Sequence, residues 1–202
     1  MKLIVITTPD YFVEEDQIIK TLFDEGLDCL HLRKPNTPAT YAERLLKLIP
    51  EKYHKRIVTH EHFSLTNEFN LKGIHLNYRN PIIPDGYKGQ VSASCHTIDE
   101  VITDRKTCNY VFLSPIFNSI SKQGYEAAFT SEELHEASHK GIINKNVYAL
   151  GGINPENIPL IKDYGFGGAV VLGDLWNKFN RDRDDNYQEL IKHFIKLKKL
   201  TD

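Results

Sequence analysis

The chain has 202 residues, of which 41% are hydrophobic and 26% are charged, with a formal net charge of −2. This composition is ordinary for a globular protein and supplies enough apolar side chains for one core. The near-equal numbers of basic and acidic residues, 25 and 27, exclude a general electrostatic attraction to nucleic acid or to an anionic membrane. No apolar run approaches the roughly 20 residues of a membrane span, so we expect no membrane partner.

The cysteines indicate a reducing environment. Cys29, Cys95 and Cys108 are odd in number and widely spaced, and no C-x-x-C pair is present, so the sequence predicts neither a zinc site nor a disulfide framework. The short apolar stretch at the N-terminus is typical of a first strand rather than of a signal peptide. We therefore expect a cytoplasmic location.

Short β-rich runs recur along the chain and mark the expected strands. They are residues 3–8, 29–34, 56–60, 73–76, 90–95, 110–116, 146–152 and 168–173. Their apolarity is continuous rather than alternating, which is typical of strands that are buried on both faces.

Helical patterns lie between most of these runs. The first helix is indicated by a stripe of apolar residues, with Gly26 at the position of a C-terminal cap. The stripe consists of Ile18, Ile19, Leu22 and Phe23. After the second run, Pro38 suits a first turn, and Tyr41, Leu45 and Leu48 follow at helical spacing.

Further along, Thr97 and Glu100 predict a capping box. Asn154 predicts a cap, with Pro155 at the first helical position and Gly165 as the stop. The last helix has one apolar face, made of Tyr187, Leu190, Ile191, Phe194 and Leu197.

The alternation of strands and helices predicts an α/β fold with a parallel sheet. Eight strands favour a closed (β/α)8 TIM barrel over an open doubly wound sheet. Residues 83–88 are barely helical, and the charged residues 180–186 are expected to form a solvated loop. No linker divides the chain, so we expect one domain over residues 1–202.

Active sites of such barrels lie at the carboxyl ends of the strands. Gly151 and Gly152 follow the seventh run, and Gly173 follows the eighth. Glycines there let backbone N–H groups approach an anion closely, and these two loops often bind phosphate. The alternative is that the glycines only make tight turns. Neither G-x-G-x-x-G nor a Walker A sequence is present, so nucleotide sites of those types are not indicated.

Cations follow the second and sixth runs. Arg33 and Lys34 end the second run, and an anion would relieve their mutual repulsion. Ser119, Ser121 and Lys122 lie in the loop "SPIFNSISKQGY" after the sixth run and suit a diphosphate. The alternative for Arg33 and Lys34 is that they are exposed charges on the rim.

Other polar residues lie near strand ends. Thr59 ends the third run and Ser94 lies near the end of the fifth. Of the nine histidines, four lie at or near strand ends, and their spacing matches no zinc motif. These are His31, His60, His75 and His96. We interpret each one as a hydrogen-bonded structural residue, and we assign no metal ligands.

Several segments, in order, resemble the thiamine-phosphate synthases. "LSPIFNSISKQG" resembles their phosphate loop, "ALGGIN" their I-G-G-I strand, "SCHT" their S-[AC]-H-[ST] segment, "GIHL" their G-[IV]-H-[IL] strand and "LHLRKP" their Q-x-R-x-K strand. The resemblance implies a barrel that joins hydroxymethylpyrimidine diphosphate to thiazole phosphate and releases pyrophosphate, with Mg²⁺ as cofactor. A pyrimidine cation forms when the diphosphate leaves, and the thiazole nitrogen captures it.

The resemblance also implies roles for individual residues. Arg33, Ser119 and Lys122 would bind the diphosphate, with Lys34, Thr59 and Ser121 nearby, and Ser94 would lie beside the pyrimidine. Arg33, Ser94 and Lys122 are therefore the expected catalytic residues. The thiazole phosphate would bind to the amides of Gly151, Gly152, Leu172 and Gly173.

The sequence departs from the family pattern at the metal site. The strand-two glutamine of the family is His31, and its second cation falls at Pro35, beside Lys34. Its Asn-Asp pair after strand three is Thr59-His60, and its metal aspartate after strand four is Asn80. Glu61 and Asp85 are the nearby carboxylates, but both are out of register. Because hard cations prefer carboxylate oxygens, we expect weakened Mg²⁺ binding.

The altered metal site leaves two other readings open. One is a thiazole tautomerase-like isomerase of the same superfamily. Its acid/base histidine would fall at Pro115, so His31 or His60 would have to replace it. The other is a non-catalytic protein that binds phosphorylated ligands. A homo-oligomer is compatible with all three readings.

Overall fold

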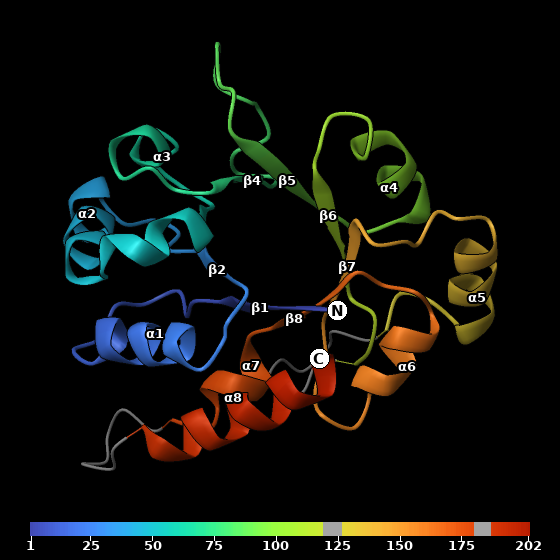
Figure 1. Cartoon of the computed structure of the whole chain (residues 1–202). Helices are drawn as coiled ribbons and strands as arrows, with labels where there is room; N and C mark the ends of the chain where they lie inside the picture. Colours follow the sequence, from blue (N-terminus) through green and yellow to red (C-terminus); the bar gives the residue numbers. More distant parts are fainter. Residues whose placement is uncertain (119–126, 180–186) are drawn as a thin grey trace.

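In the computed structural model, which describes residues 1–118, 127–179 and 187–202, the chain forms a closed barrel of eight parallel strands (Figure 1). The strands are β1 (Lys2–Ile6), β2 (Cys29–Leu32), β3 (Ile57–Thr59), β4 (Gly73–Leu76), β5 (Gln90–Cys95), β6 (Tyr110–Leu113), β7 (Val147–Leu150) and β8 (Gly168–Val171). Each strand pairs with the next, and β8 pairs with β1. The predicted (β/α)8 barrel is confirmed, and each strand overlaps one of the predicted runs, with β1 beginning one residue before its run.

Helices surround the ring of strands (Figure 1). They are α1 (Glu15–Asp24), α2 (Ala39–Leu48), η1 (Glu51–Arg56, a 3-10 helix), α3 (Leu65–Glu68), α4 (Ile98–Asp104), α5 (Ser131–His139), α6 (Ile158–Asp163), α7 (Gly173–Trp176) and α8 (Gln188–Thr201). Within the described ranges, no helix combines the length and the apolar character needed to cross a bilayer.

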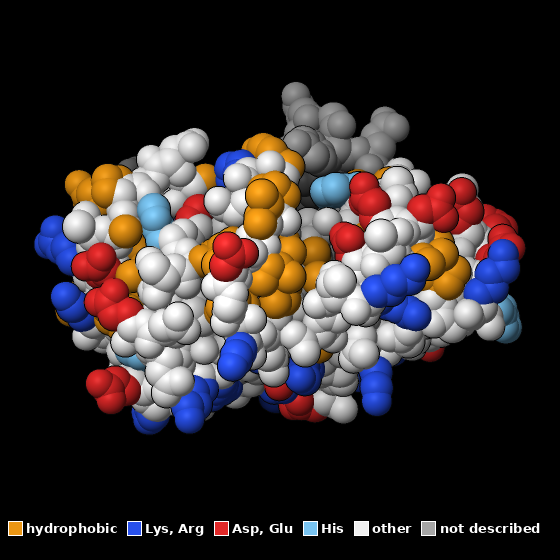
Figure 2. All heavy atoms as spheres, turned by 90° about the horizontal axis from the view of Figure 1, so that it is seen from above, with side chains coloured by type: hydrophobic (Ala, Val, Ile, Leu, Met, Phe, Trp, Pro, Cys, Tyr) orange, Lys and Arg blue, Asp and Glu red, His pale blue; other side chains and the backbone are white. Residues whose placement is uncertain are grey.

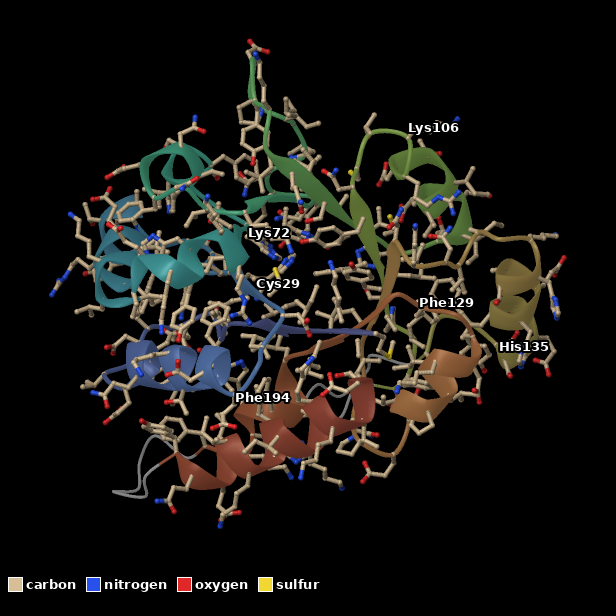
Figure 3. The ribbon with its side chains drawn as sticks, viewed as in Figure 1. Cys29, Lys72, Lys106, Phe129, His135 and Phe194 are labelled. Carbon is tan, nitrogen blue, oxygen red and sulfur yellow. The ribbon has the colours of Figure 1, made fainter. Side chains whose placement is uncertain are left out.

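The buried side chains form two shells. The inner shell fills the barrel and includes Ile4, Cys29, Phe112 and Val170. The outer shell lies between strands and helices and includes the predicted α1 stripe and Phe194 of α8. Figure 3 labels Cys29 and Phe194, one from each shell. The split follows from strand alternation, because neighbouring residues on a strand point to opposite faces of the barrel wall.

Helix ends follow the sequence signals in part. Thr97 makes the predicted capping box with Glu100, and Gly26 has the left-handed φ of +95° expected of a C-terminal cap. The prediction for α6 is wrong by about a turn: the helix begins at Ile158, and Asn154 Oδ1 instead accepts N–H bonds within the preceding turn.

The predicted stripe of α2 is also partly wrong. Tyr41 and Leu48 are exposed, whereas Ala42, Leu45 and Leu46 are buried. The buried face of this helix is therefore rotated toward the small Ala42 side chain, which fits closely against the barrel.

The connection between β4 and β5 contains no helix, which agrees with the weak pattern of residues 83–88. It projects from the barrel in Figure 1 and exposes Tyr78 and Ile82.

On the face of the molecule drawn in Figure 2, hydrophobic side chains gather in the middle, with charged side chains on either side. Residues 77–79 and 81–83 of the connection between β4 and β5 form one wall of a pocket.

Candidate active site

A pocket of about 880 Å³ opens at the carboxyl ends of the strands. Every strand contributes a lining residue at or just after its end. In strand order, these residues are Ile6, Arg33, His60, Leu76, Ser94, Ser114, Leu150 and Leu172. Most of the exposed wall area is apolar, but polar and charged side chains also line the pocket, among them Arg33, Arg79, Glu100 and Asp104. An apolar pocket with convergent polar groups is the usual character of a small-molecule site.

Arg33 is the predicted cation that reaches this pocket. Its backbone is held by Thr7, whose Oγ1 accepts from Arg33 N at 2.9 Å and donates to Arg33 O at 3.1 Å. Within the described part of the chain, its guanidinium has no hydrogen-bond or ion-pair partner. The backbone is therefore fixed while the charged group stays available to an anion.

Lys34 points in a different direction. Its side chain is buried, and Nζ lies 2.5 Å from Glu15 Oε1 and 2.7 Å from Asp10 O, over the ring of Tyr11. It does not line the pocket. The predicted role of Lys34 in diphosphate binding is therefore corrected: its ammonium joins the barrel wall to the start of α1.

The other predicted diphosphate contacts divide into two groups. Thr59 is buried, and its Oγ1 donates to Glu61 O at 2.6 Å, so this hydroxyl supports the loop after β3 instead of facing the pocket. Ser119, Ser121 and Lys122 lie outside the described residues, and their roles stay predictions.

Gly151 and Gly152 are held against the loop that follows β6. Both have left-handed φ values, +97° and +65°. A Cβ at Gly151 would lie 2.8 Å from Pro115 Cα, and a Cβ at Gly152 would collide with Asn118 O. The two glycines are therefore required for close packing of two pocket loops, which is the turn-making role that the sequence left open.

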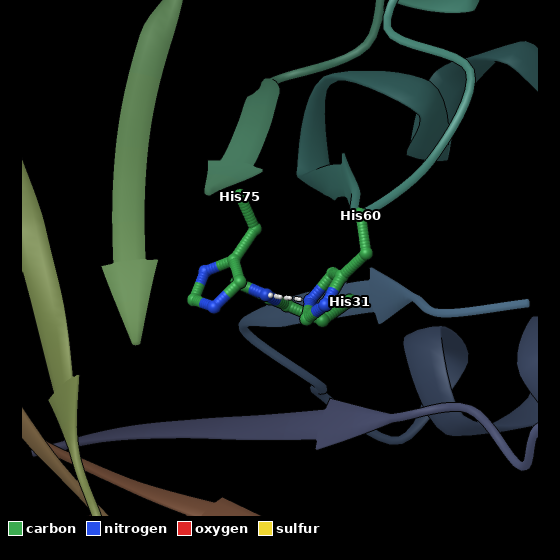
Figure 4. A group of neighbouring side chains, drawn as sticks. All are labelled: His31, His60 and His75. Atoms are coloured by element: carbon green, nitrogen blue, oxygen red, sulfur yellow. Dashed lines mark hydrogen bonds between the residues drawn. The ribbon is translucent and has the colours of Figure 1, made fainter. Parts of the chain in front are cut away.

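Three histidines from neighbouring strands meet inside the barrel (Figure 4). His31 Nδ1 lies 2.9 Å from His60 Nε2, and His31 Nε2 lies 2.8 Å from the hydroxyl of Tyr110. These contacts make a continuous chain from Tyr110 in the barrel interior, through His31, to His60 at the pocket.

His75 has its own hydroxyl partners. Its Nδ1 lies 2.8 Å from Ser92 Oγ, and its Nε2 lies 2.8 Å from Ser94 Oγ. Ser94, which was predicted beside the substrate, therefore does line the pocket, and its hydroxyl is oriented from behind by a buried imidazole.

The three imidazoles are neutral at ordinary pH. Burial is the largest cause and lowers the pKa of His75 to about 3. Burial also holds the pKa of His31 and of His60 well below 6.5, and the neighbouring His75 lowers both further. A charged form would have to be desolvated inside the barrel.

One nitrogen of each of the three rings lies within 4.8 Å of the other two, but the rings are not arranged around one metal ion. His60 stacks on His75 with centroids 4.1 Å apart and planes 22° apart. An imidazole lone pair lies in the plane of its ring, so an ion about 2.1 Å from both nitrogens would have to lie in two stacked planes at once. Both nitrogens of His31 and of His75 also have hydrogen-bonding partners. The cluster is a hydrogen-bonded network.

Comparison with known proteins agrees with this barrel and pocket. The family model described as "Thiamine monophosphate synthase" matches residues 3–175. The chain belongs to the thiamine monophosphate synthase family. A thiamine-phosphate synthase of Flavobacterium johnsoniae is 26% identical over 176 residues, which cover 79% of this chain and 82% of that protein. One from Thermoplasma acidophilum is 24% identical over 188 residues, covering 86% and 87%.

Two solved structures have the same fold, and one of them is also similar in sequence. The crystal structure of a thiamine phosphate pyrophosphorylase from Bacteroides thetaiotaomicron has 62% identity and a TM-score of 0.92, and the match covers 99% of this chain and 97% of that one. A thiamine phosphate pyrophosphorylase from Pyrococcus furiosus has 17% identity and a TM-score of 0.76, with 99% and 95% covered, and supports the fold alone.

The two positions where the synthase family resemblance places metal aspartates hold other groups here. His60 is a neutral imidazole that is bonded to His31. Asn80 donates from Nδ2 to His60 O at 3.0 Å, so its amide fastens one pocket loop to another. Neither supplies the carboxylate oxygen that Mg²⁺ prefers.

The two carboxylates named as substitutes do not restore such a site. Glu61 Oε1 lies 3.1 Å from Arg79 Nη2, and Glu61 Oε2 accepts from Lys34 N at 2.9 Å. Asp85 is exposed and does not line the pocket. Across the described residues, the donor set at this place in the synthase fold does not fit Mg²⁺.

Two features of the site were missed from the sequence. One is Arg79, which lines the pocket, and the other is the Tyr110–His31–His60 chain. Strand alternation gives a signal for the chain, because His31 lies two residues before Arg33 and so shares its face of the wall.

Proposed function

We propose that the protein is a thiamine-phosphate synthase, a transferase that joins hydroxymethylpyrimidine diphosphate to thiazole phosphate. The C–O bond between the pyrimidine methylene and the diphosphate breaks, a C–N bond to the thiazole nitrogen forms, and pyrophosphate leaves. The observation that carries the proposal is the match over 99% of the chain, at 62% identity, to a thiamine phosphate pyrophosphorylase.

The pocket supports the charge changes of this reaction. Negative charge grows on the leaving diphosphate, and the Arg33 guanidinium, with no partner in the described part of the protein, stands ready to receive it. Apolar neighbours such as Leu150 and Leu172 lower the local dielectric and strengthen that attraction. Lys122, Ser119 and Ser121 are proposed to complete the diphosphate site.

The remaining predicted residues are assigned to the two substrates. Ser94, oriented by His75, is proposed to lie beside the pyrimidine. The amides of Gly151, Gly152, Leu172 and Gly173 are proposed to take the thiazole phosphate. Members of this family are generally Mg²⁺-dependent. The donor set described above does not fit that ion, so we route no step through it. A cytoplasmic location and a homo-oligomeric state stay predictions.

A coupled-substrate assay tests the proposal. Purified protein is mixed with both substrates, and thiamine phosphate is followed by fluorescence after oxidation. We expect Arg33→Met to lower kcat/KM by about 100-fold, because a preorganised donor to the developing anion is lost. Arg44→Met makes the same change on the exposed face of α2 and is the matched control. Absence of product from folded wild-type protein would contradict the synthase assignment.

The Tyr110–His31–His60 chain favours a second candidate, a thiazole tautomerase-like isomerase. A neutral imidazole with a second proton carrier behind it can take a proton from a ligand and return one. Exchange of the thiazole C–H protons with D₂O, lost in His60→Gln but retained in Arg33→Met, would support this activity. Equal exchange in wild type and His60→Gln would exclude His60 as its base.

A further inference from the structure

We propose that the guanidinium of Arg79 occupies the place of the divalent ion, so that Arg79 and Arg33 together bind the diphosphate without a metal. The inference rests on the proposed function, because it concerns the leaving group of that reaction. It starts from the mismatch between the described donor set and Mg²⁺.

Arg79 lies in the turn after β4, directly before Asn80, the position at which the family resemblance places a metal aspartate. Asn77 Oδ1 accepts from the backbone N–H groups of Arg79 and Asn80 at 3.0 and 3.2 Å, which fixes a tight turn after β4. Asn80 then ties this turn to His60 O, at the end of β3. The two loops that would share an ion are joined instead by an amide, with Arg79 between Asn77 and Asn80 in the turn.

The Arg79 side chain lies along the pocket and still has donors to offer. Nη2 contacts Glu61 Oε1 at 3.1 Å, which orients the guanidinium. Nε is buried and has no hydrogen-bond partner among the described residues. A buried, charged donor without a partner is costly, and a phosphate oxygen is the acceptor that guanidinium groups fit best.

The surroundings favour an anion with more than one charge. Arg33 and Arg79 both line the pocket, and both are close enough to His60 to help lower its pKa. His60 stays neutral and so adds no charge of its own. The Glu61 carboxylate is turned toward Arg79 and the backbone of Lys34, and it does not line the pocket. Two carboxylates of α4, Glu100 and Asp104, do line it, but Glu100 Oε2 accepts from the backbone of His96 and Thr97 and Asp104 Oδ2 accepts from Cys95 Sγ. Two guanidinium groups offset two of the negative charges of a diphosphate, twice what a single cation would offset.

Calorimetric titration with inorganic pyrophosphate, in EDTA and in Mg²⁺, tests the inference. We expect wild type to bind pyrophosphate in EDTA, and Arg79→Met to weaken that binding by about tenfold or more, the effect of losing one charge-assisted contact. Arg79→Lys keeps the charge but loses the planar fork and should be intermediate. Arg44→Met, which removes an exposed arginine, should bind like wild type.

Glu61→Gln separates this inference from a metal site. If Arg79 binds the anion, removing the competing carboxylate tightens pyrophosphate binding in EDTA. If Glu61 is instead a ligand of Mg²⁺, the variant loses binding that wild type shows only with the metal, and the inference is overturned.

The coupled-substrate assay keeps the two proposals apart. Product that forms only with Mg²⁺ leaves the synthase function intact and overturns the role of Arg79. Pyrophosphate binding in EDTA without any product overturns the synthase function and leaves the Arg79 contact standing.

Discussion

The buried histidines predict a steep loss of stability in mild acid. His31, His60 and His75 have folded-state pKa values below the ordinary 6.5, so the unfolded chain binds more protons than the folded one as pH falls below that value. Stability is therefore fully present above pH 6.5 and decreases on acidification.

The size of the loss follows from the unfolded state. In the unfolded chain the three histidines are exposed and become protonated below about pH 6.5. Each unit of pH below the pKa stabilises the unfolded state by roughly 1.4 kcal/mol per histidine, which gives about 2 kcal/mol at about pH 5. For His75, whose pKa in the folded protein is about 3, that amount is lost from the free energy of unfolding. His31 and His60 add to this loss in the same direction. Whole domains have a stability of about 5–15 kcal/mol, so the loss is a large fraction of it.

Urea unfolding at about pH 7.5 and about pH 5 measures this loss. His75→Gln removes one titrating group but keeps an amide that can bond both serines of β5, so we expect its loss to be smaller than that of wild type by about 2 kcal/mol. Comparing the two proteins cancels the contribution of titrating groups distant from His75, while burial keeps the pKa of His31 and of His60 low in both. An identical loss in wild type and His75→Gln would refute the reasoning, because His75 would then titrate equally in both states.

Three other substitutions test contacts described above. Lys34→Met removes the ammonium from the buried Glu15 carboxylate and should lower the free energy of unfolding by about 3–5 kcal/mol, measured in urea; a loss below about 1 kcal/mol, typical of surface pairs, would contradict burial of this pair. Gly152→Ala should lower Tm by more than Gly86→Ala, since both have positive φ but only Gly152 has loop atoms against its Cβ position; equal shifts would argue against close loop packing. Tyr110→Phe should cost about 1–3 kcal/mol in urea unfolding, because a buried ring nitrogen loses its hydroxyl partner, and no change would show that the chain is not formed.

The fold could be predicted because its signals are local. Each strand is a short apolar run, and signals such as Gly26 and the Thr97 capping box lie within a few residues of the element they end or begin. The start of α6 was misplaced because Asn154 caps a turn and not the helix itself, and these two uses of an asparagine look alike in sequence.

The site was harder to predict, for two physical reasons. Arg33 and Lys34 were expected to act together because they are adjacent, but adjacent residues at a strand end point to opposite faces. Arg33 therefore reaches the pocket and Lys34 reaches Glu15. The histidine network depends on strand register, because β2 pairs with β3 and β3 pairs with β4. This pairing brings His31 next to His60, 29 residues later in the chain, and next to His75, 44 residues later. No local pattern carries that information.

The bond between Trp176 and β1 gives the protein a built-in spectroscopic reporter. Trp176 is the single tryptophan of the chain, and its Nε1 donates to Ile6 O at 2.8 Å, while Ile6 lines the pocket. Trp176 is the last residue of α7, and this helix begins directly after Leu172 on the pocket rim. Tryptophan emission therefore reports from one buried place that contacts β1 and lies next to the pocket rim. Unfolding and ligand binding can be followed by the same optical signal, with no dye attached.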